Sequence, residues 1–130
     1  MSVTVTDDGF ATVERGGDFD DANALDLAPD TEVEALRGKL KNIRLIRVDF
    51  PNFADGRGFT IARRLRSMGY RGRLRARGYV IADQYTMARR AGFDEVEISD
   101  ALAARQGEDQ WLARADWREH DYQSRLRASL

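Results

Sequence analysis

The chain has 130 residues, of which 42% are hydrophobic and 33% charged, so its length suits one ordinary domain spanning residues 1–130. It has no cysteine and one histidine, His120, which excludes disulfides, thiolate nucleophiles and metal sites built from cysteines or several histidines. No apolar run is long enough to cross a bilayer, and no basic-then-apolar leader opens the chain. We therefore expect a cytoplasmic protein without a membrane partner.

The formal net charge of -1 hides a segregation of charge along the chain. Residues 1–40 carry 10 acids and 3 bases, residues 41–90 carry 3 acids and 13 bases, and residues 91–130 carry 9 acids and 5 bases. Nineteen of the 21 bases are arginine. The basic middle either attracts an anionic ligand or acidic partner, or is neutralised within the fold by the acidic flanks.

The first thirty residues predict a hairpin followed by an irregular segment. Alternating β-branched residues flank the turn formers Asp8 and Gly9, so residues 3–13 are interpreted as a β-hairpin. The acidic segment 14–30 is interpreted as a loop or linker, because Pro29 near its end discourages a regular element.

From Thr31 onward the pattern predicts alternating helices and strands. Thr31 and Glu34 have the spacing of a capping box and predict a short helix. Apolar and β-branched patterns then predict strands at 43–49, 74–76 and 93–98, and helices over about 57–68 and 80–91.

Strand–helix–strand–helix–strand with short connections indicates parallel strands joined by right-handed crossovers. The predicted class is therefore α/β, a small parallel sheet with the N-terminal β-hairpin and C-terminal helices. The strand at 93–98 alternates apolar and acidic residues and is expected at a half-exposed edge. Ser99 is the expected cap of a further helix, and the polar tail 119–130 is expected to fray.

Ligands of parallel sheets collect at the carboxyl ends of the strands, which here receive the 50–58 loop. Asp55, Gly56, Arg57 and Gly58 run into a helix N-terminus, where free N–H groups and the helix dipole favour an anion. The two glycines would let a ligand approach the backbone, and Arg57 with Arg64 on the same flank could hold an oxyanion. The alternative is a tight turn without a ligand, since neither the phosphate-loop nor the dinucleotide pattern is complete.

Two further acids and a glutamine are the other candidates in the basic middle. Asp49, at the end of a strand, could hold a magnesium ion or act as a base, or it could cap the loop or pair with an arginine. Asp83 is placed where the dipole of the second helix favours an acid, and Gln84 beside it is expected to point inward. A buried glutamine needs partners, so it either ties the loop to the sheet or touches a ligand.

The arginine-rich stretch 63–77, which includes Arg75, raises the question of nucleic acid. The overall pI of about 5.9 makes a solvated basic face or a surface for an acidic partner the better interpretation. Phe50, Phe53 and Phe59 form either a small aromatic core or a platform for a ligand or partner.

Residues 48–66, VDFPNFADGRGFTIARRLR, resemble a bacterial domain-of-unknown-function family that is often encoded beside assimilatory sulfite reductase and adenylyl-sulfate reductases. The resemblance continues through residues 69–76, through Asp83 and Gln84, and through 89–94. Some members are labelled oxidoreductases. Many relatives carry cysteine where this chain has Ala91, so no thiol role is implied here. The resemblance implies a pathway, sulfate assimilation, and supplies no catalytic residues.

The leading hypothesis is a non-catalytic accessory or subunit-like protein of assimilatory sulfite reduction. It would meet a redox partner, sulfite reductase or another protein of the pathway, through its arginine-rich surface, with the 49–58 loop binding an oxyanion or a partner carboxylate. The alternative is an enzyme acting on a sulfur or phosphorus oxyanion, with Asp49 or Asp55 as base or metal ligand and Arg57 on the oxyanion. The sequence assigns no cofactor and, in the leading hypothesis, no metal. The N-terminal hairpin must extend this small sheet, or a second copy of the chain must cover it, and we expect a homodimer.

Overall fold

A computed structural model of the chain describes residues 2–12 and 23–118. The strands are β1 (Ser2–Thr6), β2 (Gly9–Thr12), β3 (Ala24–Leu27), β4 (Leu45–Phe50), β5 (Arg73–Gly78) and β6 (Glu95–Ser99). The helices are α1 (Arg57–Ser67), α2 (Tyr85–Ala91), α3 (Asp100–Arg105) and α4 (Glu108–Leu112), with the 3-10 turns η3 (Val33–Leu36) and η4 (Ala82–Gln84). None of the helices in this described part of the chain has the length and apolar character needed to cross a membrane.

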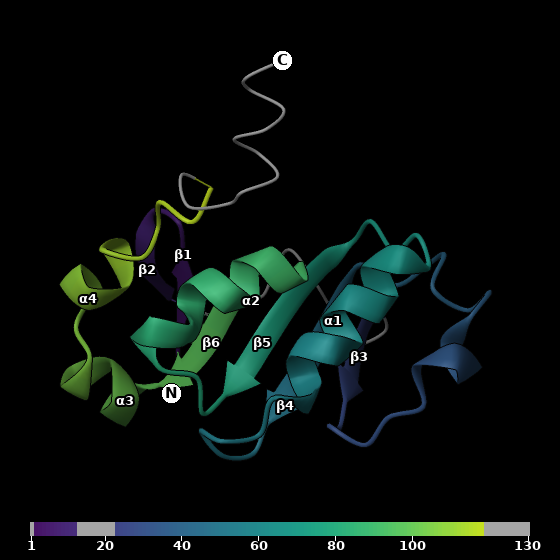
Figure 1. Cartoon of the computed structure of the whole chain (residues 1–130), viewed down its shortest axis with the longest axis horizontal. Helices are drawn as coiled ribbons and strands as arrows, with labels where there is room; N and C mark the ends of the chain where they lie inside the picture. Colours follow the sequence, from purple (N-terminus) through teal and green to yellow (C-terminus); the bar gives the residue numbers. More distant parts are fainter. Residues whose placement is uncertain (1, 13–22, 119–130) are drawn as a thin grey trace.

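The strands form one six-stranded sheet in the order β2-β1-β6-β5-β4-β3 (Figure 1). Strands β3 to β6 are parallel neighbours, and β1 lies antiparallel between β6 and β2. This arrangement confirms the predicted α/β class, the N-terminal hairpin and the C-terminal helices. The hairpin extends the sheet beyond β6, which is one of the two ways in which we expected the small parallel sheet to be completed.

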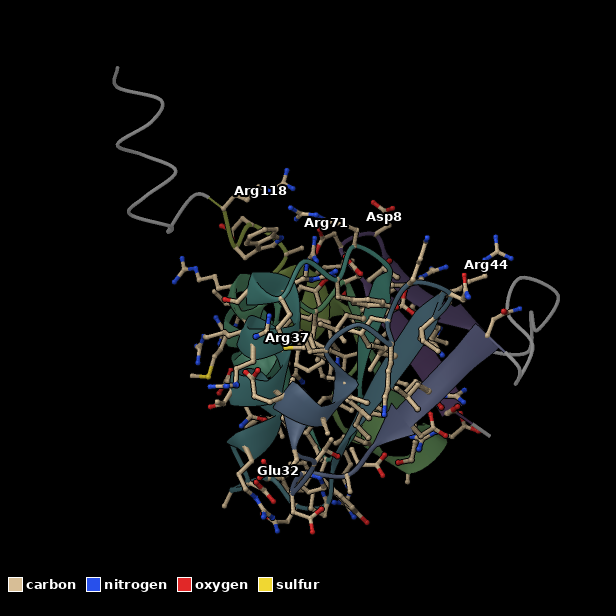
Figure 2. The ribbon with its side chains drawn as sticks, turned by 90° about the vertical axis from the view of Figure 1, so that its right-hand side faces the viewer. Asp8, Glu32, Arg37, Arg44, Arg71 and Arg118 are labelled. Atoms are coloured by element: carbon tan, nitrogen blue, oxygen red, sulfur yellow. The ribbon has the colours of Figure 1, made fainter. Side chains whose placement is uncertain are left out.

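The helices cover one face of the sheet, which carries the apolar side chains of alternate strand positions (Figures 1 and 2). Phe50 of β4, Phe59 of α1 and Phe93 before β6 pack edge to face there, with ring centroids 5.0–6.4 Å apart. Gly58 is buried against them, and a Cβ at this position would collide with the Phe50 ring. Close packing of α1 on β4 therefore explains Gly58 better than ligand access does.

The opposite face, which we call the charged face, carries acids and arginines in register. Asp26, Arg47, Arg75 and Glu95 follow one another across β3 to β6, and Asp49, Arg77 and Glu97 form the next row. Each of these arginines is paired with an acid on a neighbouring strand, as in Arg47–Asp26 at 2.5 Å. Much of the basic middle of the sequence is therefore neutralised within the fold.

The prediction that 93–98 is an edge strand is wrong, because β6 lies between β1 and β5. Its alternating acids face the arginines of β5 and not solvent. Glu95 is only 2% exposed and accepts hydrogen bonds from Arg73 at 2.9 Å and from Arg75 at 2.5 Å. An acid at every second position therefore indicates here a partner strand of opposite charge.

Two further predictions need correction in the region before β4. The segment 14–30 is not a loop throughout: residues 24–27 form β3, and residues 13–22 lie outside the described part. The helix expected after Thr31 is only the single 3-10 turn η3. The capping box does not form, because the Thr31 hydroxyl donates to the Ala28 carbonyl and Glu34 instead contacts arginines.

A hydrogen-bond cluster joins the hairpin to the C-terminal segment. The Asp7 carboxylate accepts hydrogen bonds from the Tyr85 hydroxyl, from the Arg89 guanidinium at 3.1 Å and from the Trp117 indole at 3.3 Å. Burial acts to raise the pKa of Asp7, but these hydrogen bonds outweigh it and hold the pKa below its ordinary value.

Trp111 is buried and packs on Tyr85. The hydroxyl of Ser99, the predicted helix cap, accepts a hydrogen bond from the Leu102 N–H. The tail predicted to fray, 119–130, lies outside the described residues.

Candidate functional site

The loop 50–58, predicted to bind an anion, lies at the carboxyl ends of the strands, as expected. A carboxylate of the loop itself, that of Asp55, takes the place of a bound anion. The Asp55 carboxylate accepts the Arg57 backbone N–H at 3.1 Å, and the Arg57 guanidinium donates to both of its oxygens at 3.0 and 2.7 Å. The guanidinium and this N–H hold the pKa of Asp55 below its ordinary value. Asp55 is therefore a weak general base, and it already occupies the start of α1, where we expected an oxyanion. Gly56 has a negative φ, so its backbone does not require glycine.

Arg57 and Arg64 line one cavity of about 320 Å³ between α1 and residues 29–34, which we call the small pocket. Glu32 and Glu34 line the same cavity. Glu34 accepts hydrogen bonds from Arg64 and, at 2.9 Å, from Arg37, and these two contacts lower the pKa of Glu34. The structure thus brings the two predicted arginines together, with carboxylates beside them.

Asp49 and Arg75 lie on the charged face, away from the small pocket. Asp49 accepts two hydrogen bonds from Arg77, at 3.2 and 3.0 Å. Arg75 is 8% exposed and contacts Glu95 and, at 3.1 Å, Glu97. Both residues therefore take part in the internal ion pairs of the sheet.

Asp83 and Gln84 lie in the 3-10 turn η4, directly before α2. Asp83 is exposed and accepts a hydrogen bond from Arg114 at 2.6 Å. Gln84 accepts the Ile81 N–H at 3.0 Å and donates to the Phe53 carbonyl at 3.2 Å, so it ties the turn after β5 to the 50–56 loop. This is the structural alternative that the sequence left open for Gln84.

The three phenylalanines around the loop divide between core and surface. Phe50 and Phe59 belong to the buried aromatic cluster, in agreement with the interpretation of these residues as a small aromatic core. Phe53 is 42% exposed and packs edge to face on Tyr79, itself 51% exposed, with ring centroids 5.2 Å apart.

A second cavity in the described part of the chain lies at the other end of the sheet, where β4 and β5 begin. Its volume is about 750 Å³, and two segments form its walls, residues 37–44 before β4 and residues 68–73 after α1. Its lining side chains are basic (Arg37, Lys41, Arg44, Arg71 and Arg73) or apolar and aromatic (Leu40, Ile43, Met68 and Tyr70), with glycines between. None of the described lining residues is acidic. We call this cavity the basic cleft.

Backbone and side-chain hydrogen bonds join the two walls of the basic cleft. The Arg73 N–H donates to the Arg44 carbonyl at 3.0 Å. The Tyr70 hydroxyl lies 3.2 Å from both the Ile43 and the Arg73 carbonyl oxygens and shares its proton between them. Burial raises the pKa of Tyr70 to about 12, so the hydroxyl stays protonated at neutral pH.

Arg66 of α1 holds one wall of the basic cleft, residues 68–73, in place by hydrogen bonds. Its guanidinium donates to the Tyr70 carbonyl at 3.0 Å and to the Gly72 carbonyl at 2.9 Å. It also reaches the Gly92 carbonyl at 2.7 Å and the Asp94 carboxylate at 3.0 Å. Because one planar group satisfies four acceptors, the turn that carries Arg71 is held to the body of the fold.

Three bases of the cleft lack acidic partners within the described structure. Lys41, Arg44 and Arg71 are exposed and make no ion pair or side-chain hydrogen bond with any described residue. Arg37 pairs with Glu34, and Arg73 with Glu95. Among the described residues, these three bases of the basic cleft therefore have no acidic counter-ion.

Sequence reasoning missed this cleft, and Lys41 and Arg44 in particular. The available signal was that bases stand just before two adjacent parallel strands, Lys41 and Arg44 before β4 and Arg71 before β5. The amino ends of parallel neighbours meet at one edge of a sheet, just as their carboxyl ends do. The rule that placed the candidate site at the carboxyl ends therefore also predicts a cluster of bases at the amino ends.

The described residues contain no group of three or more histidine, cysteine, aspartate or glutamate side chains placed to hold a metal ion. The chain belongs to the family described as bacterial protein of unknown function (DUF934), whose sequence profile matches residues 24–129. That range contains the basic cleft and the small pocket, whereas β1 and β2 precede it. No curated protein and no solved structure matched the chain in these comparisons.

Proposed function

We propose that this protein is an accessory binding protein that docks through its basic cleft on an acidic region of a redox partner. The observation that carries the proposal is the contrast between the two ends of the sheet. At the carboxyl ends Asp55 pairs with Arg57, and Arg64 of the following helix pairs with Glu34. At the amino ends Lys41, Arg44 and Arg71 line a cleft without acidic partners among the described residues.

Local charge supports docking better than overall charge does. The net charge is only -1, so the chain as a whole attracts neither acids nor bases. A basic cleft with apolar surface between its charges steers an acidic partner and fixes its orientation. Such an interface binds more weakly as salt concentration rises, because exposed charges are screened.

The partner that we propose is assimilatory sulfite reductase. This part of the proposal rests on the family resemblance over residues 48–66 and on the gene neighbourhood that the resemblance implies. An accessory role needs no catalytic residue in the chain. It agrees with the pairing of Asp49 by Arg77 and of Asp55 by Arg57.

The experiment is a binding titration of the purified protein against purified sulfite reductase at low and moderate salt. We expect binding that weakens with salt and that falls at least about tenfold in the double variant Arg44→Glu, Arg71→Glu. The matched control is Arg63→Glu, which makes the same charge change at an exposed position of α1 outside both cavities. Equal weakening by the control and the cleft variant, or no binding by the wild type, would refute the proposal.

A second candidate, an enzyme acting on a sulfur or phosphorus oxyanion, is favoured by one observation. Arg57 and Arg64 share the small pocket, whose volume of about 320 Å³ suits a small ligand. The test is a thermal-shift assay with sulfate, sulfite and phosphate, with and without Mg²⁺, on the wild type and Arg57→Ala. A shift that Arg57→Ala abolishes supports this candidate, and equal behaviour of the two proteins contradicts it.

A further inference from the structure

The size of the basic cleft indicates the kind of anion that would fill it. A volume of about 750 Å³ lies well inside the range of sites that enclose extended organic ligands. A single sulfate or phosphate has only a few heavy atoms and would leave most of the cleft empty. The ligand therefore needs length as well as negative charge.

The bases are distributed along the cleft and do not converge on one point. Figure 2 shows Arg37, Arg44 and Arg71 well separated on the molecule, with Arg44 and Arg71 near the end of the sheet where the strands begin. A fork of guanidinium groups around one oxyanion would bring such side chains together. Separated bases instead match negative charges that are themselves spaced along a chain.

Apolar side chains lie between these bases. Leu40, Ile43 and Met68 are partly buried hydrophobic residues that pack against the core and also line the cleft. Flexible methionine adapts to different apolar groups at peptide-binding surfaces. Tyr70 is 4% exposed with its hydroxyl bonded to backbone, so the cleft offers no open tyrosine ring on which a nucleobase could stack.

We infer that the basic cleft binds an extended acidic peptide segment that places one apolar side chain against Leu40, Ile43 and Met68. The acidic side chains on either side of this anchor contact Lys41, Arg44 and Arg71. This inference rests on the proposed function and deepens it: the acidic region of the partner is a flexible segment and not a rigid surface.

The test is fluorescence anisotropy with labelled synthetic peptides. The first peptide contains aspartate and glutamate around one central leucine, and the second has serine in place of that leucine. We expect the leucine peptide to bind about tenfold more tightly, because only it transfers an aliphatic side chain from water to the cleft. Arg44→Glu and Arg71→Glu should each weaken both peptides, and Arg63→Glu should weaken neither.

Several results would overturn the inference. Equal binding of the two peptides would show that the apolar anchor does not exist. Displacement of the peptide by sulfate, phosphate or generic duplex RNA at lower concentration than unlabelled peptide would assign the cleft to another class of ligand. Equal weakening of the leucine peptide by Arg63→Glu and Arg44→Glu would show that binding does not take place in the cleft.

The failure of the inference and that of the proposed function are distinguishable. If the leucine peptide binds as expected and sulfite reductase does not, the inference stands and the proposed partner is wrong. If sulfite reductase binds in a way that depends on Arg44 and Arg71 while the leucine peptide does not bind, docking uses a rigid surface and the inference fails.

Discussion

Replacement of Arg66 by methionine should lower the free energy of unfolding more than is usual for a partly exposed helix residue. The Arg66 guanidinium joins α1 to two turns, through the Tyr70 and Gly72 carbonyls and through Gly92 and Asp94. Arg66→Met replaces the aliphatic stem of the side chain by one of similar size but removes every one of these hydrogen bonds. The variant thus tests the polar contacts apart from packing.

The expected magnitude follows from the number of acceptors and their exposure. Hydrogen bonds to a charged group contribute about 1.5–3 kcal/mol each, so four acceptors set a high upper limit. The Arg66 side chain is 24% exposed, so water can replace some of the lost partners. We expect a loss of about 3 kcal/mol for Arg66→Met, and about 1.5 kcal/mol for Arg66→Lys, because an ammonium group cannot span both turns.

The assay is urea unfolding followed by tryptophan fluorescence, with Trp111 as the buried reporter. The matched control is Arg63→Met, on the same helix and exposed, which should change the free energy of unfolding by less than about 0.5 kcal/mol. If Arg66→Met is as stable as this control, the guanidinium does not hold the two turns and the reasoning is refuted.

Three further changes test other parts of the fold. Glu95→Gln should lower the free energy of unfolding, measured in urea, by about 2 kcal/mol, because it leaves the buried Arg75 guanidinium with one carboxylate fewer. An unchanged urea midpoint would contradict the buried ion pair. Gly78→Ala should lower the melting temperature more than Gly38→Ala. Both glycines have positive φ, but only at Gly78 would a Cβ meet a backbone oxygen, at 2.5 Å. Equal losses in melting temperature would rule out this clash. The depressed pKa of Asp7 gives stability that is present above its ordinary value of 3.8 and lost as pH falls through the lower folded value. The stability difference between wild type and Asp7→Asn, measured in urea, should therefore shrink as pH falls below about 4, and a constant difference would refute this.

The central strand–helix units could be predicted because their patterns are strong and local. The apolar runs of β4, α1 and α2 and the stop at Gly92, whose φ is 119°, needed no knowledge of the rest of the chain. Strand β3 could not be predicted in this way. Its two inward residues, Leu25 and Leu27, stand in an acidic segment near Pro29, and it becomes a strand because β4 offers a free edge to pair with.

The sites were harder to predict than the elements, because charge pairing depends on register. The sequence placed Arg57 and Arg64 correctly on one flank of a helix, but it could not show that Asp55 and Glu34 already contact them. Nor could it show that Arg75 faces Glu95 across adjacent strands. Pairings of this kind depend on which strands become neighbours and with what offset.

Glu34 gives the basic cleft and the small pocket a shared counter-ion, through which anions bound in them would be thermodynamically linked. Its carboxylate is the common counter-ion of Arg37, which lines the basic cleft, and of Arg64, which lines the small pocket. An anion that draws Arg37 away in the cleft leaves the whole carboxylate to Arg64, and so makes Arg64 less available to a second anion in the pocket. By reciprocity, an anion bound in the small pocket would change the affinity of the basic cleft by the same factor, although the two ligands would never touch.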